Sequence, residues 1–304
     1  MTGQRRARRV LAWVLAAVST VAAAPSPPAV PDGLDQSVAP DQAVTTGHAE
    51  LSAGHVDIGP RFRDGGWSVL VHDDTTAPPV WRTLADVVIR VPDAAVEPVP
   101  DDPAYAFLGS RPGTPVHVIP QTQDRDVVWV GWNTQDPGVM DAIARGVTMT
   151  LLGVQGPGAM VVFLQSGNLG APEVLWDTHR PYPQPVWVET NTHTHANWVF
   201  SEPGVYLAAV EFSAELAGGG TVSAREVLRF AVGDATDARE AFGVAFTAPP
   251  PSATAPAAAA GDSGTPGRST VLVALIGGAA AALVAGLVGL VLRDRRVRRR
   301  ADVP

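Results

Sequence analysis

The sequence predicts an all-β body of the sandwich type, joined to a single C-terminal transmembrane helix. Three observations lead to this prediction. Short runs rich in Val, Ile, Thr and aromatic residues recur between residues 48 and 233. Clusters of Gly, Pro, Asp and Asn separate these runs, as turns separate the strands of a sandwich. Near the C-terminus, an uncharged run of 23 residues is long enough to cross a bilayer.

The predicted strands follow one another at short spacing. β-branched and aromatic residues dominate them, which is typical of strands. They are WSVLVHDD, ADVVIRVPD, TPVHVIPQT, DVVWVGWNT, VTMTLLGVQGPGAMVVFLQ and VYLAAVEFSAEL. Gly156-Pro157-Gly158 predicts a turn inside the fifth, and AGGGTVSAREVLRFAVG predicts a hairpin that closes on a final strand. We expect only one helix, a short one near residues 136–145.

One local motif favours a particular sandwich. Pro203-Gly204-Val205-Tyr206 resembles the turn before the penultimate strand of immunoglobulin-like domains, in which a tyrosine fixes a corner. This resemblance predicts an immunoglobulin-like β-sandwich. The body of about 190 residues has room for one large sandwich or two small ones.

The N-terminus predicts a cleaved secretory signal peptide over residues 1–24. Four arginines within the first nine residues precede an apolar run, Val10 to Ala24, that ends in small residues. An uncleaved N-terminal anchor is the alternative. Residues 25–47 are rich in Pro, Asp and Ala without periodicity, which predicts a linker leading to the body at 48–233.

The C-terminal part predicts a stalk and an anchor. Residues 234–269 are rich in Pro and Ala, and such runs bury too little apolar area to offset the entropy of ordering. Residues 270–292 would span roughly 34 Å as a helix, against about 30 Å of hydrocarbon. Six arginines follow within residues 293–304 and predict a cytoplasmic tail. We therefore expect a type I single-pass protein of the cell membrane, with residues 48–233 outside the cell.

Charge and cysteine content exclude several classes of function. All 22 basic residues are arginines, and ten of them lie in the two terminal basic flanks. Residues 25–269 hold 12 arginines and 28 acidic residues, a net charge near −16. Such a surface suits cations and disfavours nucleic acid, which needs concentrated basic residues. The absence of cysteine excludes disulfides, thiolate metal sites and thiol catalysis.

Two histidines stand close together in the segment ETNTHTHANWVF. If residues 192–200 form one strand, alternate side chains share a face. Trp198 then points to the core, and His193, His195 and Asn197 point the other way. Two imidazoles on one face can bind Zn²⁺ or another transition metal. The alternative is a solvated or packing face without a ligand.

A complete metal site needs more donors than this pair, because tetrahedral Zn²⁺ takes about three or four protein ligands. His55 and Asp57 in GHVDIG share one strand face and are the next candidates. Which segments lie side by side does not follow from their spacing. The expected metal ligands, for zinc or manganese, are His193, His195, His55 and Asp57. The remaining candidate donors are His48, His117 and His179. Because His117 lies between two valines, we expect a hydrogen-bonded, partly buried histidine there rather than a metal ligand.

No pattern predicts an enzyme. Ser166 and Ser201 lack the surroundings of a nucleophile elbow, and there is no phosphate loop or dinucleotide fingerprint. The acidic pairs Asp73-Asp74 and Asp101-Asp102 indicate turns rather than catalytic carboxylates. A metal-dependent hydrolase is a third alternative, but no general base is identifiable.

The segments SAGHVDIGPRF, HVIPQTQDRDVVWVGWNT, VQGPGAMVVF and THTHANWVFSEPGVYLAAVEFSAEL occur in one order between residues 48 and 233. Together they resemble the choice-of-anchor M domain family of actinobacterial, transporter-associated surface proteins. The resemblance implies an exported domain held by a varied anchor, with some relatives encoded beside an ABC transporter of the metal-uptake type. This chain holds one copy and lacks an LPxTG sorting motif, so its anchor would be the span at 270–292. The shared motif residues are His55, Asp57, Trp129, Trp132, Asn133, His193, His195, Asn197, Trp198 and Tyr206.

Two functional hypotheses follow. In the first, the body binds a divalent metal or metal complex and serves an ABC importer, whose substrate-binding protein is the partner. Trp132, Asn133 and Asn197 would then contact the ligand. In the second, the body is a structural or adhesive module that contacts wall glycan or protein. A patch of exposed side chains would favour the second hypothesis, and its candidate members are Trp67, Trp81, Trp129, Trp132 and Trp187.

Overall fold

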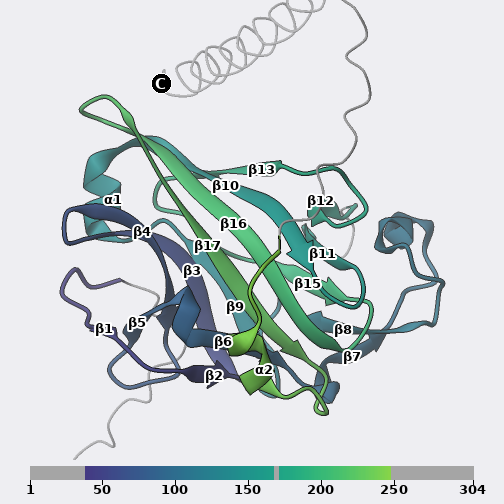
Figure 1. Ribbon diagram of the computed structural model, residues 1–304. Coiled ribbons are helices and arrows are strands. Elements are labelled where there is room, and N and C mark those ends of the chain that lie inside the picture. The colour runs from purple at the N-terminus through teal and green to yellow at the C-terminus, as the bar shows by residue number, and fades with distance from the viewer. Residues whose placement is uncertain (1–37, 168–170, 248–304) are drawn as a thin grey trace, which may run out of the picture. The chain divides into compact units, whose positions relative to one another are not determined.

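The computed structural model describes residues 38–167 and 171–247, which form three β-sheets with two short α-helices (Figure 1). The all-β prediction is confirmed for this part of the chain. The segments predicted as signal peptide (1–24) and as membrane span (270–292) lie outside the described residues. No helix within the described ranges is long and apolar enough to cross a membrane.

The 17 strands of the described residues divide among three sheets. Sheet A has the order β1 (Val44–Thr45), β5 (Val80–Thr83), β4 (Gly66–Asp73), β3 (Gly54–Arg63), β9 (Val128–Asn133) and β14 (His193–His195). Sheet B has the order β13 (Gln184–Glu189), β10 (Ile143–Gln155), β16 (Gly204–Leu216), β17 (Thr221–Val232), β6 (Val87–Val91) and β2 (Ala49–Leu51). Sheet C has the order β12 (Glu173–Asp177), β11 (Met160–Leu164), β15 (Asn197–Phe200), β8 (Pro115–Ile119) and β7 (Val96–Pro98).

Short helices connect the strands. The α-helices are α1 (Pro137–Ala142) and α2 (Ala238–Gly243), and three-residue or six-residue 3-10 turns lie at Leu84–Asp86, Asp93–Ala95 and Pro103–Leu108. Asp136 caps α1 by accepting a hydrogen bond from the Val139 amide at 3.1 Å. The predicted short helix is therefore present, although the chain is already a strand from Ile143 onward.

The sheets mix antiparallel hairpins with parallel pairs. β3 pairs parallel with β9, and β6 pairs parallel with both β2 and β17. An immunoglobulin sandwich has about seven to nine antiparallel strands in two sheets, so the described part is larger and more mixed. The finer immunoglobulin-like topology stays a prediction.

The main core draws on all three sheets. It holds Val56 and Ile58 of sheet A, Met149 and Phe212 of sheet B, and Trp198 of sheet C. Strand side chains alternate between faces, so Val56 and Ile58 face this core while their neighbours His55 and Asp57 lie on the opposite face of sheet A, where they are also buried. These neighbours on the opposite face carry the candidate site.

The predicted tyrosine corner is present. The Tyr206 hydroxyl donates to the Glu202 carbonyl at 2.8 Å, and the ring lies so close to Gly156 that a Cβ there would come within 2.3 Å of it. Burial raises the pKa of Tyr206 to about 12. The hydroxyl therefore stays protonated and fixes the turn at the start of β16.

Residues 192–200 do not form the single continuous strand on which the assignment of side chains to faces was conditional. The chain forms β14 in sheet A and then β15 in sheet C, with the buried Ala196 between them. The folded region also extends beyond 48–233 at both ends. Val38 is buried against Leu70 and Trp81, and Ala241 of α2 is fully buried.

Candidate metal centre

Three neighbouring strands of sheet A carry the candidate site. Parallel pairing aligns Asp57 on β3 with Gly131 on β9, and antiparallel pairing aligns Gly131 with His195 on β14. Asp57, Gly131 and His195 thus form one row across the sheet. His55 and His193 lie two residues away on their strands, so they share the same face.

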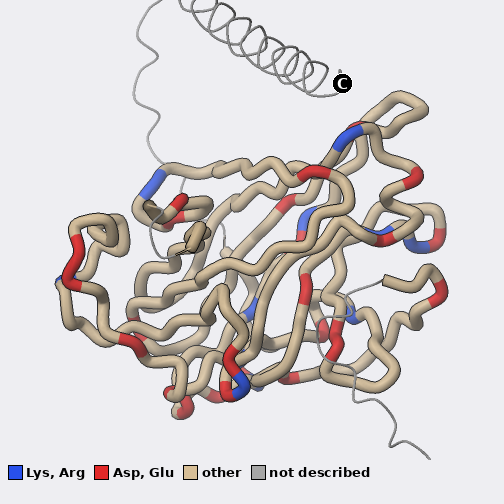
Figure 2. The backbone as a smooth tube through the Cα atoms, turned by 180° about the vertical axis from the view of Figure 1, so that it is seen from behind, with Lys and Arg blue, Asp and Glu red and all other residues tan. Residues whose placement is uncertain are grey.

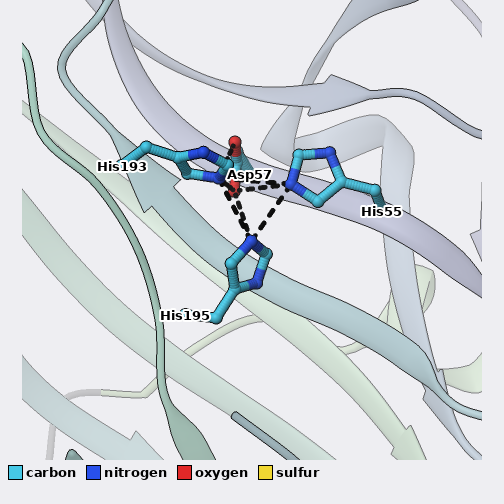
Figure 3. A group of neighbouring side chains, drawn as sticks. All are labelled: His55, Asp57, His193 and His195. Carbon is cyan, nitrogen blue, oxygen red and sulfur yellow. Dashed lines mark hydrogen bonds and ion pairs between the residues drawn. The ribbon is translucent and has the colours of Figure 1, made fainter. Parts of the chain in front are cut away.

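Four side chains converge above this row (Figure 3). The three imidazole Nε2 atoms form a nearly equilateral triangle. The Nε2 atom of His55 lies 3.2 Å from that of His193 and 3.1 Å from that of His195, and the last two are 3.1 Å apart. Three nitrogens in such a triangle cannot all satisfy one another with protons, whereas one cation can accept a lone pair from each.

Asp57 supplies a fourth corner. Its Oδ1 atom lies 3.1 Å from Nε2 of His193, 3.5 Å from that of His55 and 3.9 Å from that of His195. Ligand atoms bound tetrahedrally at about 2.0–2.1 Å are about 3.3 Å apart. The six separations between these four donor atoms bracket that value, so the set matches a tetrahedral ion.

The other carboxylate oxygen of Asp57 is held by Asn133. The Asn133 amide donates to Oδ2 at 2.9 Å. Oδ2 also lies 2.9 Å from Nε2 of His193, so both carboxylate oxygens face the cluster and the Asn133 contact fixes the carboxylate in rotation. Asn133 is one of the predicted ligand-contacting residues, and its position makes it a support for a metal ligand.

Asp74 orients His55 from behind. Its Oδ2 atom accepts a hydrogen bond from Nδ1 of His55, so in the neutral ring Nε2 carries the lone pair. The same carboxylate accepts from Nδ1 of His72 at 3.2 Å. His72 in turn contacts the Gln42 side chain, Nε2 to Oε1, at 2.8 Å. A chain of polar contacts therefore links the cluster to the segment before β1.

Trp129 and Gly131 of the segment WVGWN shape the remaining surroundings. The indole of Trp129 stacks on the His195 imidazole with ring centroids 3.6 Å apart and 10° between the planes. At Gly131, a Cβ would come within 2.6 Å of Oδ1 of Asp57 and 2.8 Å of Cε1 of His195. Only glycine leaves room for both side chains to meet over β9.

The four donors are buried rather than solvated. His55 is 5 % exposed, Asp57 2 % and His195 8 %, and the His193 side chain is 8 % exposed. This burial contradicts a solvated strand face at His193 and His195, whereas the alternative of a packing face without a ligand stays open. Burial removes water as a hydrogen-bond partner, so the polar atoms of these imidazoles must find their partners within the protein.

Burial and mutual contact shift the pKa values of the cluster in different directions. Burial lowers the pKa of His195 to about 4, against the opposing charge of Asp57. Burial also acts to lower the pKa of His55, but the hydrogen bond to Asp74 and the charge of Asp57 raise it overall. For Asp57, burial is outweighed by the bonds and charges of His193 and His55, so its pKa is lowered. The carboxylate is thus ionised and available as a ligand.

Three other histidines lie apart from the cluster. His117 is buried, and its Nε2 atom lies 3.1 Å from Oδ1 of Asp93, as expected for a hydrogen-bonded structural histidine. Nδ1 of His179 lies 2.7 Å from Oδ1 of Asp177. His48 stacks on Phe242 with ring centroids 3.9 Å apart. None of them belongs to the group of converging donors that the described residues contain.

Two predicted ligand-contacting residues lie elsewhere. Trp132 is 4 % exposed and packs in the main core, on the face of β9 opposite Gly131. Asn197 lies in sheet C, where its side chain accepts from the Gln121 amide at 3.0 Å. Their positions do not support the predicted contacts. Sequence reasoning did not connect four further residues with the metal site, namely Asp74, His72, Gly131 and Trp129.

The five tryptophans that could have distinguished the two hypotheses do not form an exposed patch. Trp81 and Trp132 are buried, Trp67 and Trp129 are partly buried, and Trp187 is the exposed one of the five. The observation that would have favoured the second hypothesis is therefore not made.

Comparisons of this chain with known protein families, with curated proteins and with solved structures find no match.

Proposed function

We propose that the described body is a metal-binding module that holds one divalent transition-metal ion between His55, Asp57, His193 and His195. The observation that carries the proposal is the convergence of four donor atoms at separations suited to a tetrahedral ion. Three imidazoles and one carboxylate are ligands that zinc accepts readily. Manganese, the other ion considered, prefers more oxygen ligands and is the second choice.

Charge supports a cation at this position. Asp57 and Asp74 both have lowered pKa values, so two carboxylates lie within and beside the cluster. Two negative charges balance one divalent ion. Figure 2 shows acidic residues at many points around the described body and fewer basic ones, a distribution that raises the local concentration of cations.

Four protein ligands favour binding over catalysis. A catalytic zinc usually keeps one coordination position open for water, with about three protein ligands. Here the protein supplies the fourth donor, and the cluster is buried. We therefore propose a binding role and no hydrolytic activity.

The cellular setting that we propose rests on the resemblance in sequence. We infer a cell-surface protein anchored in the membrane by residues 270–292, whose extracellular body passes a metal or metal complex to an ABC importer. Deletion of the gene should then reduce metal uptake at limiting concentration, and the double variant described next should not restore it. Full metal uptake in the deletion strain would overturn the importer role but would leave the metal-binding role untouched.

The binding role is tested by metal analysis and titration calorimetry of the full 304-residue chain with Zn²⁺ and Mn²⁺. We expect about one Zn²⁺ per chain, and no tight binding in the variant His193→Ala/His195→Ala. His179→Ala is the matched control, because this histidine lies outside the cluster. Binding that survives in the double variant would contradict the assignment.

A further inference from the structure

Trp187 is the most exposed large apolar side chain among the described residues, with 52 % of its surface open. It lies on β13, the edge strand of sheet B, whereas the histidine–aspartate cluster belongs to sheet A. A single exposed apolar side chain needs no special explanation. What surrounds Trp187 therefore decides whether it forms a site.

The indole is held in place without being covered. Trp187 packs against β10 at Gly146, where a Cβ would come within 2.8 Å of its Cζ2 atom. The Arg145 guanidinium carbon lies 5.8 Å from the ring centroid, within the range of a cation–π contact. The amide of Thr190 donates to the Arg145 carbonyl at 2.9 Å, and this hydrogen bond holds the two chain segments together beside the ring. The result is a fixed, exposed aromatic surface.

A donor and an acceptor flank this surface. Glu189 on β13 pairs with Gly146 on β10, the residue that follows Arg145. The side chains of Glu189 and Arg145 therefore extend from neighbouring backbone positions. Both residues are exposed, and the Thr134 hydroxyl donates to the Glu189 backbone carbonyl rather than to its carboxylate. Exposed hydrogen-bonding groups of both kinds thus stand on either side of the indole.

These residues line one hollow. Arg145, Trp187, Glu189 and Thr190 surround a volume of about 570 Å³, within the range of small-molecule sites. The hollow combines one flat apolar surface with hydrogen-bonding side chains. A pyranose ring has the matching form, because its C–H bonds make a flat apolar face and its hydroxyl groups lie around the rim.

We propose that Trp187, Arg145 and Glu189 form a binding site for a pyranose glycan. The indole stacks on the apolar face of one sugar ring, the guanidinium donates to ring hydroxyls or acetamido oxygens, and the carboxylate accepts from hydroxyls. A purely anionic ligand is disfavoured by Glu189. An added peptide strand is disfavoured by Pro185, since a proline in the edge strand β13 has no amide hydrogen to donate.

The test is calorimetric titration of the full-length chain with chitotetraose, a β-1,4-linked oligosaccharide. We expect a dissociation constant of about millimolar. Trp187→Ala should weaken binding about tenfold or more, as loss of a central aromatic contact does, and Trp187→Phe should retain part of the affinity. Val96→Ala is the matched control, because Val96 is the other exposed large apolar side chain among the described residues.

The site would be overturned if the unmodified chain did not bind chitotetraose, or if Trp187→Ala bound it equally well. It would also be overturned if the chain self-associated, Trp187→Ala abolished this self-association, and chitotetraose did not affect it. The last outcome would assign this surface to a second copy of the chain. The variant His193→Ala/His195→Ala should bind the oligosaccharide normally, which separates this site from the metal proposal.

Discussion

The Asp74 carboxylate accepts a hydrogen bond from Nδ1 of His55, and this contact aims Nε2 of the same ring at the imidazoles of His193 and His195. A carboxylate hydrogen-bonded behind a metal-binding histidine fixes its tautomer and raises its basicity. Burial raises the pKa of Asp74, but the hydrogen bonds from His55 and His72 lower it well below its ordinary value. Asp74 is thus charged whenever the ring must coordinate.

Asp74→Ala should lower zinc affinity about 10–100-fold, because His55 loses its orienting partner while all four proposed ligands remain. Competition with a fluorescent zinc chelator measures this change. Asp101→Ala is the control, since Asp101 is an exposed member of the other acidic pair. Unchanged affinity in Asp74→Ala would show that Asp74 has no supporting role.

Gly131→Ala should destabilise the protein by about 1–3 kcal/mol through overpacking. The added methyl group would meet Oδ1 of Asp57 at 2.6 Å and the Thr194 carbonyl at 2.7 Å. It should also weaken metal binding by pushing Asp57 and His195 apart. Urea unfolding measures the first effect, and Gly218→Ala, with open space around its Cβ position, is the control. Equal stability of the two variants would be inconsistent with the close packing over β9.

Metal binding should release protons. The pKa of His55 is raised above its ordinary value in the metal-free protein, so a fraction of this ring is protonated near neutral pH. A coordinating imidazole must be neutral, and binding therefore displaces that proton. The apparent zinc affinity should rise with pH through this range. Calorimetry in buffers of different ionisation enthalpy counts the released protons, and a count of zero at pH 7 would contradict the prediction.

Acid should destabilise the metal-free protein. His195 has a folded pKa of about 4, below its ordinary value of 6.5, so the unfolded chain binds more protons between these pH values. The contribution of His195 to stability is therefore fully present above about pH 6.5 and is lost as the pH drops toward 4. His195→Gln should flatten this part of the profile, as measured by urea unfolding at several pH values. An equally steep fall in His195→Gln would assign the acid sensitivity to other groups.

Bound zinc should stabilise the fold, because His193 and His195 lie on β14, which pairs only with β9 in sheet A. A metal bond from β14 to β3 adds a link across three strands. At a free zinc concentration of 100 times the dissociation constant, the gain is about 2.7 kcal/mol. Thermal unfolding with and without zinc measures it. A rise of equal size in His193→Ala/His195→Ala would mean that the ion binds elsewhere.

Much of the fold could be predicted from sequence because strand periodicity is local. The segment WSVLVHDD corresponds to β4 and DVVWVGWNT to β9. The His-x-Asp and His-x-His spacings likewise identified side chains that share a face of their strands. These features depend only on neighbours in the chain.

The remaining features depend on which strands lie side by side. The parallel pairing of β3 with β9 places Asp57 next to Gly131, and no local pattern specifies that pairing. The break at Ala196 was missed because both halves of the segment alternate as one strand would. Asp74 lies in the turn after β4, as predicted, but its contact with His55 was missed because His55 lies 19 residues earlier, on β3.

The most direct test of the central claim is X-ray absorption spectroscopy of the zinc-loaded full-length chain. The account predicts a four-coordinate ion with three imidazole nitrogens and one carboxylate oxygen, at about 2.0–2.1 Å. In His193→Ala/His195→Ala, that imidazole signature should disappear. A six-coordinate, water-rich shell in the unmodified protein, or a spectrum unchanged by the double variant, would contradict the account.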